Sequence, residues 1–154
     1  MLEIVPLTDI DRLVEWRREV VGEVFGAAPS AELLSANRRY YERHIPDGSH
    51  LAVVARNDGV DAGCGAICLS DELPSPDNPS GRCAYLMNIY VRPAYRSQGI
   101  GHAIVRHLVE TARRKDCDKI YLETTTGARS LYHSIGFKEL SGILRYDDIQ
   151  HTES

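Results

Sequence analysis

The first 45 residues alternate between apolar and polar positions with periods that predict one strand and two helices. Leu2–Leu7 alternates weakly, as a half-buried strand does. Thr8 then offers an N-cap, and Asp9 and Asp11 suit the positive end of a helix over residues 10–25. Its apolar face consists of Ile10, Leu13, Val14, Val21 and Val24. Gly26 and Pro29 end this helix, and Ser30 is the cap of a second helix over residues 31–44.

The middle of the chain predicts a hairpin, a loop and a buried strand. A turn at Pro46-Asp47-Gly48 leads into a strand over Leu51–Arg56. Asn57-Asp58-Gly59 is a strong hairpin signal, so Val60–Leu69 returns as the second arm. Residues 70–82 contain three prolines and are predicted to be a loop, after which Cys83–Val91 is the most β-like run of the sequence.

The hydrophobic period changes after Pro93 and predicts helices that alternate with strands. The long helix has its apolar face at Ile100, Ala103, Ile104, Leu108, Thr111 and Ala112. Further along we expect a strand at Lys119–Glu123, a short helix at Ala128–Ser134, the start of a strand at Gly136–Leu140 and a last strand at Ile143–Ile149. Because strands alternate with helices only in this half, a mixed sheet is expected.

Composition and charge narrow the class of protein. The 154 residues suffice for one domain, and 43% hydrophobic with 26% charged residues suits a globular rather than a disordered chain. A net charge of -4 argues against nucleic acid as a partner. No stretch is apolar for the length of a membrane span, and acidic residues interrupt any secretory signal at the N-terminus. We therefore expect a cytoplasmic protein that binds no membrane.

The four cysteines are interpreted as small buried residues of a reducing compartment. Cys64, Cys68, Cys83 and Cys117 form no CxxC pair, and no histidine cluster has zinc spacing. No metal is expected.

The informative motif lies where the strand ending at Val91 passes through a glycine-containing turn into the long helix. A helix N-terminus exposes unpaired N–H groups, and Gly99 and Gly101 let a phosphate approach the backbone closely. Arg96 is placed to meet a second phosphate charge. Purely structural glycines are the alternative. A P-loop is excluded because its Gly-Lys-Ser/Thr ending is absent, and the dinucleotide fingerprint because Ile104 replaces its third glycine.

Two segments resemble the GNAT superfamily of N-acetyltransferases. Arg96-Ser97-Gln98-Gly99-Ile100-Gly101 resembles the R/Q-x-x-G-x-G/A pyrophosphate loop of that family, and the strand Ile89–Val91 precedes it as the family's hydrophobic strand does. Downstream, residues 128–137 resemble the family's A-x-x-L-Y-x-x-x-G-F segment. The clear match covers Leu86 to Leu140, whereas the first half matches only in its order of elements.

The resemblance implies a fold and a cosubstrate. The fold would be an α/β (α+β) single domain over residues 1–154, with a mixed, twisted sheet flanked by helices and splayed between Cys83–Val91 and Lys119–Glu123. Acetyl-CoA would lie in that splay, its pantetheine along the backbone of Ile89, Tyr90 and Val91. The pyrophosphate site would consist of Arg96, Ser97, Gln98, Gly99, Ile100, Gly101 and His102. One departure is Thr125, which stands where the family often has Asn.

The function implied is transfer of an acetyl group from acetyl-CoA to a primary amine by direct attack in a ternary complex. Tyr132 occupies the tyrosine place of the second segment and is the candidate general acid. Asn88 is the polar exception in its strand and either touches the acyl carbonyl or the acceptor, or bonds across a bulge. Glu123 either binds the acceptor or acts as base, or is a solvated strand end. Backbone N–H groups near Ile89 and Tyr90 would polarise the thioester carbonyl.

Two other functions remain open from the sequence. A non-catalytic acyl-CoA-binding regulatory module would keep the glycine loop, and an unrelated nucleotide-binding domain would bind ATP or NAD. The expected partner is a small-molecule or peptide amine, and a homodimer is left open. We expect the loop 70–82 and the first two helices to form the acceptor cleft, with Asp71, Glu72 and Asp77 favouring a cationic acceptor.

Overall fold

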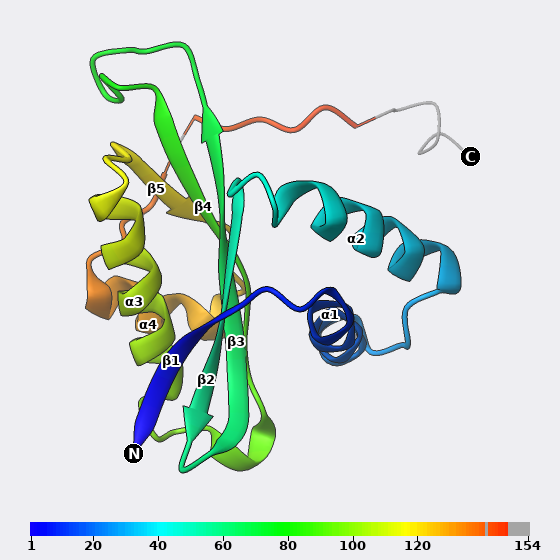
Figure 1. Ribbon diagram of the computed structural model, residues 1–154. Coiled ribbons are helices and arrows are strands. Elements are labelled where there is room, and N and C mark those ends of the chain that lie inside the picture. Colours follow the sequence, from blue (N-terminus) through cyan, green and yellow to red (C-terminus); the bar gives the residue numbers. More distant parts are fainter. Residues whose placement is uncertain (141, 148–154) are drawn as a thin grey trace.

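The computed structural model describes residues 1–140 and 142–147 of the chain. Along these residues five strands and four α-helices follow one another, with a short 3-10 turn before α3 and another before α4 (Figure 1). The bounds are β1 Leu2–Leu7, α1 Ile10–Phe25, α2 Ala31–His44, β2 His50–Asn57, β3 Val60–Asp71, β4 Arg82–Val91, α3 Ile100–Arg114, β5 Lys119–Leu122 and α4 Arg129–Ile135.

The strands form one mixed sheet in the order β1-β2-β3-β4-β5. Each of the first four strands is antiparallel to the next, and β5 lies parallel to β4. α3 and α4 cover one face of the sheet, and α1 and α2 cover the other (Figure 1). The mixed sheet expected from the sequence is thus confirmed.

The sheet is splayed at its β4–β5 edge, as the resemblance implied. β5 pairs only with Cys83–Leu86, whereas β4 continues to Val91. The second half of β4 therefore has no neighbour on its β5 side among the described residues, and α3 begins close to the end of this free stretch.

Two hydrophobic clusters hold the helices on the sheet. On one face, α3 buries Ile100, Ile104, Val105, Leu108 and Ala112 against the strands. Burial of each of the larger aliphatic side chains contributes roughly 1.5–3 kcal/mol. Gly65 of β3 permits this packing, because an added Cβ would lie 2.7 Å from Cγ2 of Ile104. The position of the α3 N-terminus thus depends on a close helix–sheet contact.

The helix and hairpin boundaries predicted from the sequence agree closely with the structure. α1 and α2 span the predicted residues, and the Ser30 side chain caps α2 by accepting from the amide of Leu33. The hairpin turn is present, with Asp58 at φ 52° and Gly59 at φ 82°. One cap was misplaced: the side chain of Asp9, rather than that of Thr8, accepts from the amide of Arg12.

Several other predictions require correction. β3 extends to Asp71, β5 ends at Leu122, and α4 runs over Arg129–Ile135. The strand predicted at Gly136–Leu140 is wrong, because a strand needs a neighbour for its hydrogen bonds and these residues have none. Residues 143–147 of the predicted last strand are irregular for the same reason, and residues 148 and 149 lie outside the described part of the chain. The apolar face of α1 is also shorter than predicted, since Val24 is exposed.

All four cysteines are free thiols, but only Cys64 and Cys83 are buried, while Cys68 and Cys117 are partly exposed. Within the described residues, no group of three or more His, Cys, Asp or Glu side chains is arranged to hold a metal ion. None of the described helices combines the length and the apolarity that a bilayer crossing requires.

Candidate active site

The N-terminus of α3 presents free backbone amides at the end of β4. Gly99 is the N-cap in the left-handed region at φ 81°, and the first intrahelical bond runs from the amide of Ala103 to the Gly99 carbonyl at 3.0 Å. The amides of Ile100, Gly101 and His102 precede that bond and have no acceptor within the helix. Together with the dipole of a 15-residue helix, they make a site for an anion.

Gly99 and Gly101 differ in whether the backbone conformation requires a glycine. Gly99 adopts a backbone conformation that other residues rarely take. Gly101 does not, and a Cβ added to it would meet only Leu131 at 3.6 Å and Val91 at 3.7 Å, which are ordinary van der Waals distances. Since the fold does not require a glycine at 101, close access to the backbone explains it better than structure does.

The arginines beside this turn are already paired with carboxylates of α1. The Arg96 guanidinium donates to the Val91 carbonyl at 2.9 Å and to Glu23 at 3.3 Å, and it lies over the Tyr90 ring. Arg92 donates to both carboxylate oxygens of Glu19 at 3.0 Å. Arg96 therefore lies beside the predicted phosphate site, with a carboxylate as its present anionic partner.

A bulge interrupts β4 where the sheet begins to splay. Cys64 pairs with Tyr90 and Ala66 with Met87, so Asn88 and Ile89 together lie opposite the single residue Gly65. Asn88 has a positive φ of 57°, and its side-chain oxygen accepts from the Arg17 guanidinium at 2.8 Å. The bulge is thus present, but the Asn88 side chain bonds to α1 instead of across it.

A row of polar and aromatic residues crosses the sheet on the face that carries α1 and α2. Strand registers place His50 beside Cys68, Cys68 beside Tyr85, and Tyr85 beside Tyr121. The rings of Tyr85 and Tyr121 have centroids 5.0 Å apart. Burial raises the pKa of Tyr85, and the charge of nearby Glu123 raises it further. Glu123 itself is exposed just past the end of β5.

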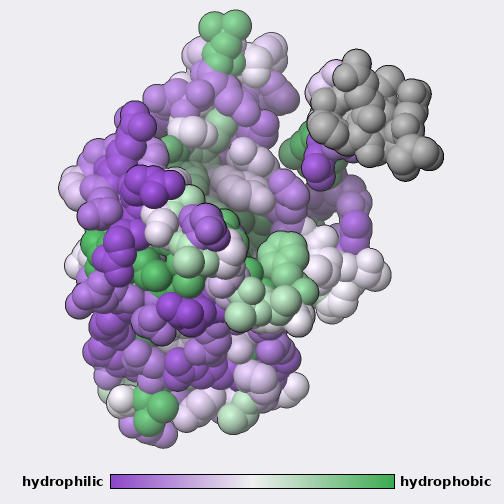
Figure 2. Space-filling model, turned by 90° about the vertical axis from the view of Figure 1, so that its right-hand side faces the viewer, coloured by the Kyte–Doolittle hydropathy of each residue, from purple (hydrophilic) through white to green (hydrophobic). Residues whose placement is uncertain are grey.

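Above this row, Tyr40 of α2 hydrogen-bonds His50 and Cys68, each at 2.8 Å. The loop after β3 bounds the other side of the row, where Glu72 pairs with Lys119 at 2.9 Å. Figure 2 views this side of the molecule, whose surface is hollowed between the projecting loop and the helices. The segments expected to form the acceptor cleft therefore do lie around one face of the sheet.

Tyr132 lies on α4. The preceding residue of this helix, Leu131, has the side chain that lies nearest to a Cβ added at Gly101. Tyr132 is 8% exposed and its ring packs edge-on against Phe137, with centroids 5.8 Å apart. Burial raises the pKa of its hydroxyl, so the phenol stays protonated at neutral pH. Tyr132 is thus a buried, protonated phenol on the helix whose Leu131 lies near Gly101.

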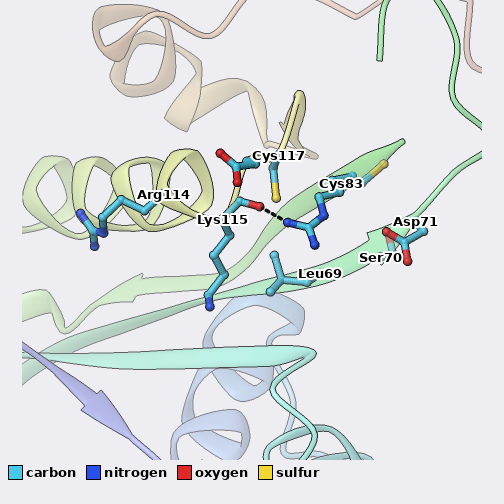
Figure 3. Close-up of a pocket in the computed structure, with 9 residues that line it drawn as sticks. Leu69, Ser70, Asp71, Cys83, Arg114, Lys115 and Cys117 are labelled. Carbon is cyan, nitrogen blue, oxygen red and sulfur yellow. Dashed lines mark hydrogen bonds between the residues drawn. The ribbon is translucent and has the colours of Figure 1, made fainter. Parts of the chain in front are cut away.

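A further cavity lies away from these residues. It encloses about 400 Å³ at the C-terminal end of α3, where Arg82 donates to the Lys115 carbonyl at 2.8 Å (Figure 3). Asp71, which the sequence analysis assigned to the acceptor cleft, lines this cavity together with Cys83 and Cys117, but none of the residues predicted to be catalytic or to bind the cofactor does. A helix C-terminus offers carbonyl groups instead of free amides, so this cavity lacks the anion-binding chemistry of the opposite end.

One residue of the site went unnoticed in the sequence. Arg17 belongs to the stripe of α1 whose other members, Leu13, Val14, Val20 and Val21, are buried. A charged residue within an apolar helical stripe often marks a functional position, and this pattern could have identified Arg17 from the sequence.

Comparisons with known proteins bear on this geometry. The family model described as "Acetyltransferase (GNAT) family" matches residues 10–137. Thialysine N-epsilon-acetyltransferase of Sus scrofa is 33% identical over 96 residues, which cover 48% of this chain and 56% of the pig protein. The chain thus spans about half the length of that relative. Glucosamine 6-phosphate N-acetyltransferase 1 of Oryza sativa subsp. japonica is 28% identical over 82% of this chain and 78% of its own length.

Solved structures agree with the fold. A predicted acetyltransferase from Clostridium acetobutylicum with acetyl-CoA superposes with a TM-score of 0.85 at 25% identity, covering 98% of this chain and 99% of that one. A GCN5-related N-acetyltransferase from Ralstonia eutropha gives a TM-score of 0.79 at 21% identity, covering 96% and 99%. At that identity the second likeness concerns the fold alone.

Proposed function

Since the chain belongs to the acetyltransferase (GNAT) family, we propose that it transfers an acetyl group from acetyl-CoA to a primary amine by direct attack in a ternary complex. The observation that carries this proposal is the α3 N-terminus, where free amides and a glycine that the fold does not need lie beside the splayed end of β4.

The chain's own backbone would hold the cosubstrate. Amides of Gln98 to His102 bind the pyrophosphate, and Ser97, at φ 63°, turns the backbone ahead of them. Ile89, Tyr90 and Val91 bind the pantetheine arm as an added strand, because β5 pairs only as far as Leu86 and leaves this edge free. The Clostridium acetobutylicum structure, which contains acetyl-CoA, supports this choice of cosubstrate.

The proposed chemistry uses groups on both sides of the β4 bulge. Backbone N–H groups near Ile89 and Tyr90 polarise the thioester carbonyl, and the bulge at Asn88 frees backbone from the ladder for this purpose. The neutral amine nitrogen attacks the carbonyl carbon, the carbon–sulfur bond breaks, and Tyr132 protonates the departing thiolate. The second proton that the nitrogen loses as it becomes an amide restores the Tyr132 phenol, directly or through water. Glu123, directly or through water, takes the proton that the ammonium must lose.

The acceptor would enter over the tyrosine row. Among the acidic residues expected to attract a cation, Glu72 is neutralised by Lys119 and Asp77 bonds to Ser75. Asp71 lines the cavity at the C-terminal end of α3 instead of the tyrosine row. Glu123 lies beside Tyr85 of that row and forms no ion pair among the described residues, so it is the better counter-charge for an ammonium group. The relatives named above act on thialysine and on glucosamine 6-phosphate, and both acceptors are primary amines.

The test is release of free CoA thiol from acetyl-CoA with a panel of amines, amino acids, peptides and aminoglycosides. Amine-dependent release, with the acetylated amine identified by mass spectrometry, is the expected result. Tight acetyl-CoA binding without turnover on any member would instead indicate a regulatory module. Binding of ATP or NAD in preference to CoA would remove the site assignment altogether.

A further inference from the structure

Arg17 is a cation at a position that the fold reserves for apolar side chains. In α1 the residues at 13, 14, 20 and 21 are buried, and Arg17 lies three and four residues from them, on the same stripe. A charged side chain at such a position loses hydration and destabilises the fold unless a partner compensates. Arg17 itself is half-buried, so its guanidinium calls for a partner of opposite charge.

The structure provides Arg17 with a neutral partner only. Its guanidinium donates to the Asn88 side-chain oxygen at 2.8 Å, a partly buried contact. Three neighbouring arginines are each matched with a carboxylate: Arg12 with Asp61, Arg92 with Glu19 and Arg96 with Glu23. Among the described residues Arg17 forms no such ion pair, so most of its five N–H donors remain available to another molecule.

The open donors of Arg17 lie on the side of the sheet where the acceptor would bind. Arg17 reaches the bulge at Asn88, next to the backbone that would polarise the thioester. Its field also reaches α2: burial raises the pKa of Tyr41 to about 12, and Arg17 opposes that rise. The cation thus lies at the Asn88 bulge, beside the proposed reaction centre, on the helix that packs against α2.

We propose that Arg17 binds a carboxylate of the acceptor, so that the preferred substrates are primary amines that also carry a free carboxylate, as amino acids do. This inference rests on the proposed function. A guanidinium and a carboxylate match in a two-pronged, charge-assisted geometry. The single guanidinium that reaches the Asn88 bulge balances one negative charge, which favours a carboxylate over a doubly charged phosphate. Glu123 then supplies the matching charge for the ammonium end of a zwitterion.

The experiment compares acceptors that differ only in the carboxylate, such as L-lysine with 1,5-diaminopentane and L-alanine with ethylamine. Initial rates of CoA release would be measured for the wild type and for Arg17→Met, which keeps much of the side chain's bulk. The matched control is Arg18→Met on the exposed side of the same helix, where Arg18 lies beside Glu15 at 3.6 Å. Thermal unfolding would verify that each variant is folded.

A lost hydrogen bond to a charged group is worth about 1.5–3 kcal/mol, so Arg17→Met should lower kcat/KM for the amino acids about 10- to 150-fold. The loss should appear in KM, while the decarboxylated amines and the Arg18→Met control change less than about twofold. The wild type should prefer each amino acid over its decarboxylated partner, which tests the inference even if Arg17→Met does not fold.

Two results would overturn the inference while leaving the proposed function intact. An equal fall in kcat for both members of each pair would assign Arg17 to the transition-state oxyanion, and an unchanged preference would leave it no role in selection. Absence of amine-dependent CoA release with every acceptor would instead refute the proposed function, so the two failures are distinguishable.

Discussion

Two glycines on different helices allow cofactor binding to be separated from stability. Gly22 lies within α1 and Gly101 within the first turn of α3, and a Cβ added at either position meets no close contact. Replacing a helical glycine with alanine stabilises a helix interior by up to about 1 kcal/mol. Gly22→Ala should therefore raise Tm by about 2–4 °C and leave acetyl-CoA binding unchanged.

Gly101 should respond differently because its Cα faces the proposed phosphate site. Gly101→Ala and Gly101→Val should keep the fold, since the nearest side chains are 3.6 and 3.7 Å from the new Cβ. The added carbons would nevertheless hold the pyrophosphate away from the amides of Ile100 and His102. We expect acetyl-CoA binding to weaken at least tenfold for Gly101→Val, about 1.4 kcal/mol, and less for Gly101→Ala.

Calorimetric titration with acetyl-CoA and thermal unfolding, carried out on wild type and all three variants, check this reasoning. A folded Gly101→Val with wild-type affinity would refute the proposal that the cofactor phosphates lie against this turn. Weaker binding by Gly22→Ala as well would show that the loss comes from a general change in the helices.

Other residues give predictions that separate chemistry, affinity and stability. Tyr132→Phe should lower kcat on the order of 10²-fold with acetyl-CoA affinity unchanged, whereas full kcat with a lower Tm would make Tyr132 a packing residue. Glu23→Gln should tighten acetyl-CoA binding two- to fivefold at low salt, about 0.4–1 kcal/mol, because Arg96 loses a competing carboxylate. Adding Arg96→Gln to this variant should abolish the gain in affinity. Burial lowers the pKa of His50 in the folded protein from 6.5 to about 4, so His50 binds a proton more tightly in the unfolded chain than in the folded one. Urea unfolding should therefore show stability falling between pH 6.5 and 4, by up to about 3 kcal/mol, and His50→Gln should flatten this dependence.

The first half of the fold could be predicted because its signals are local. Helices α1 and α2 have caps and apolar stripes within their own sequences, and Asp58-Gly59 adopts the positive φ angles that a tight hairpin needs. The end of the chain could not, because β-propensity depends on a neighbouring strand. Leu140, Ile143 and Tyr146 have strand-forming character, but the described residues around them pair with no strand and leave these side chains exposed.

The site shows the same division between local and distant information. The glycine turn at Gly99 and Gly101 and the tyrosine segment around Tyr132 are continuous motifs, so the sequence located them. The pairing of Arg96 with Glu23 and of Arg17 with Asn88 joins residues 73 and 71 positions apart, which no local pattern encodes. The tyrosine row likewise depends on strand registers, and a register becomes known only from the folded sheet.

The most direct test of the account follows an isotopically labelled acetyl group from acetyl-CoA in the presence and absence of an amine acceptor such as L-lysine. Mass spectrometry should find the label on an amine nitrogen of the product, in amounts equal to the free CoA released, and initial rates should show both substrates bound before either product leaves. Label that stays on CoA with every acceptor, or that accumulates on the protein as a covalent intermediate, would contradict direct transfer at this site.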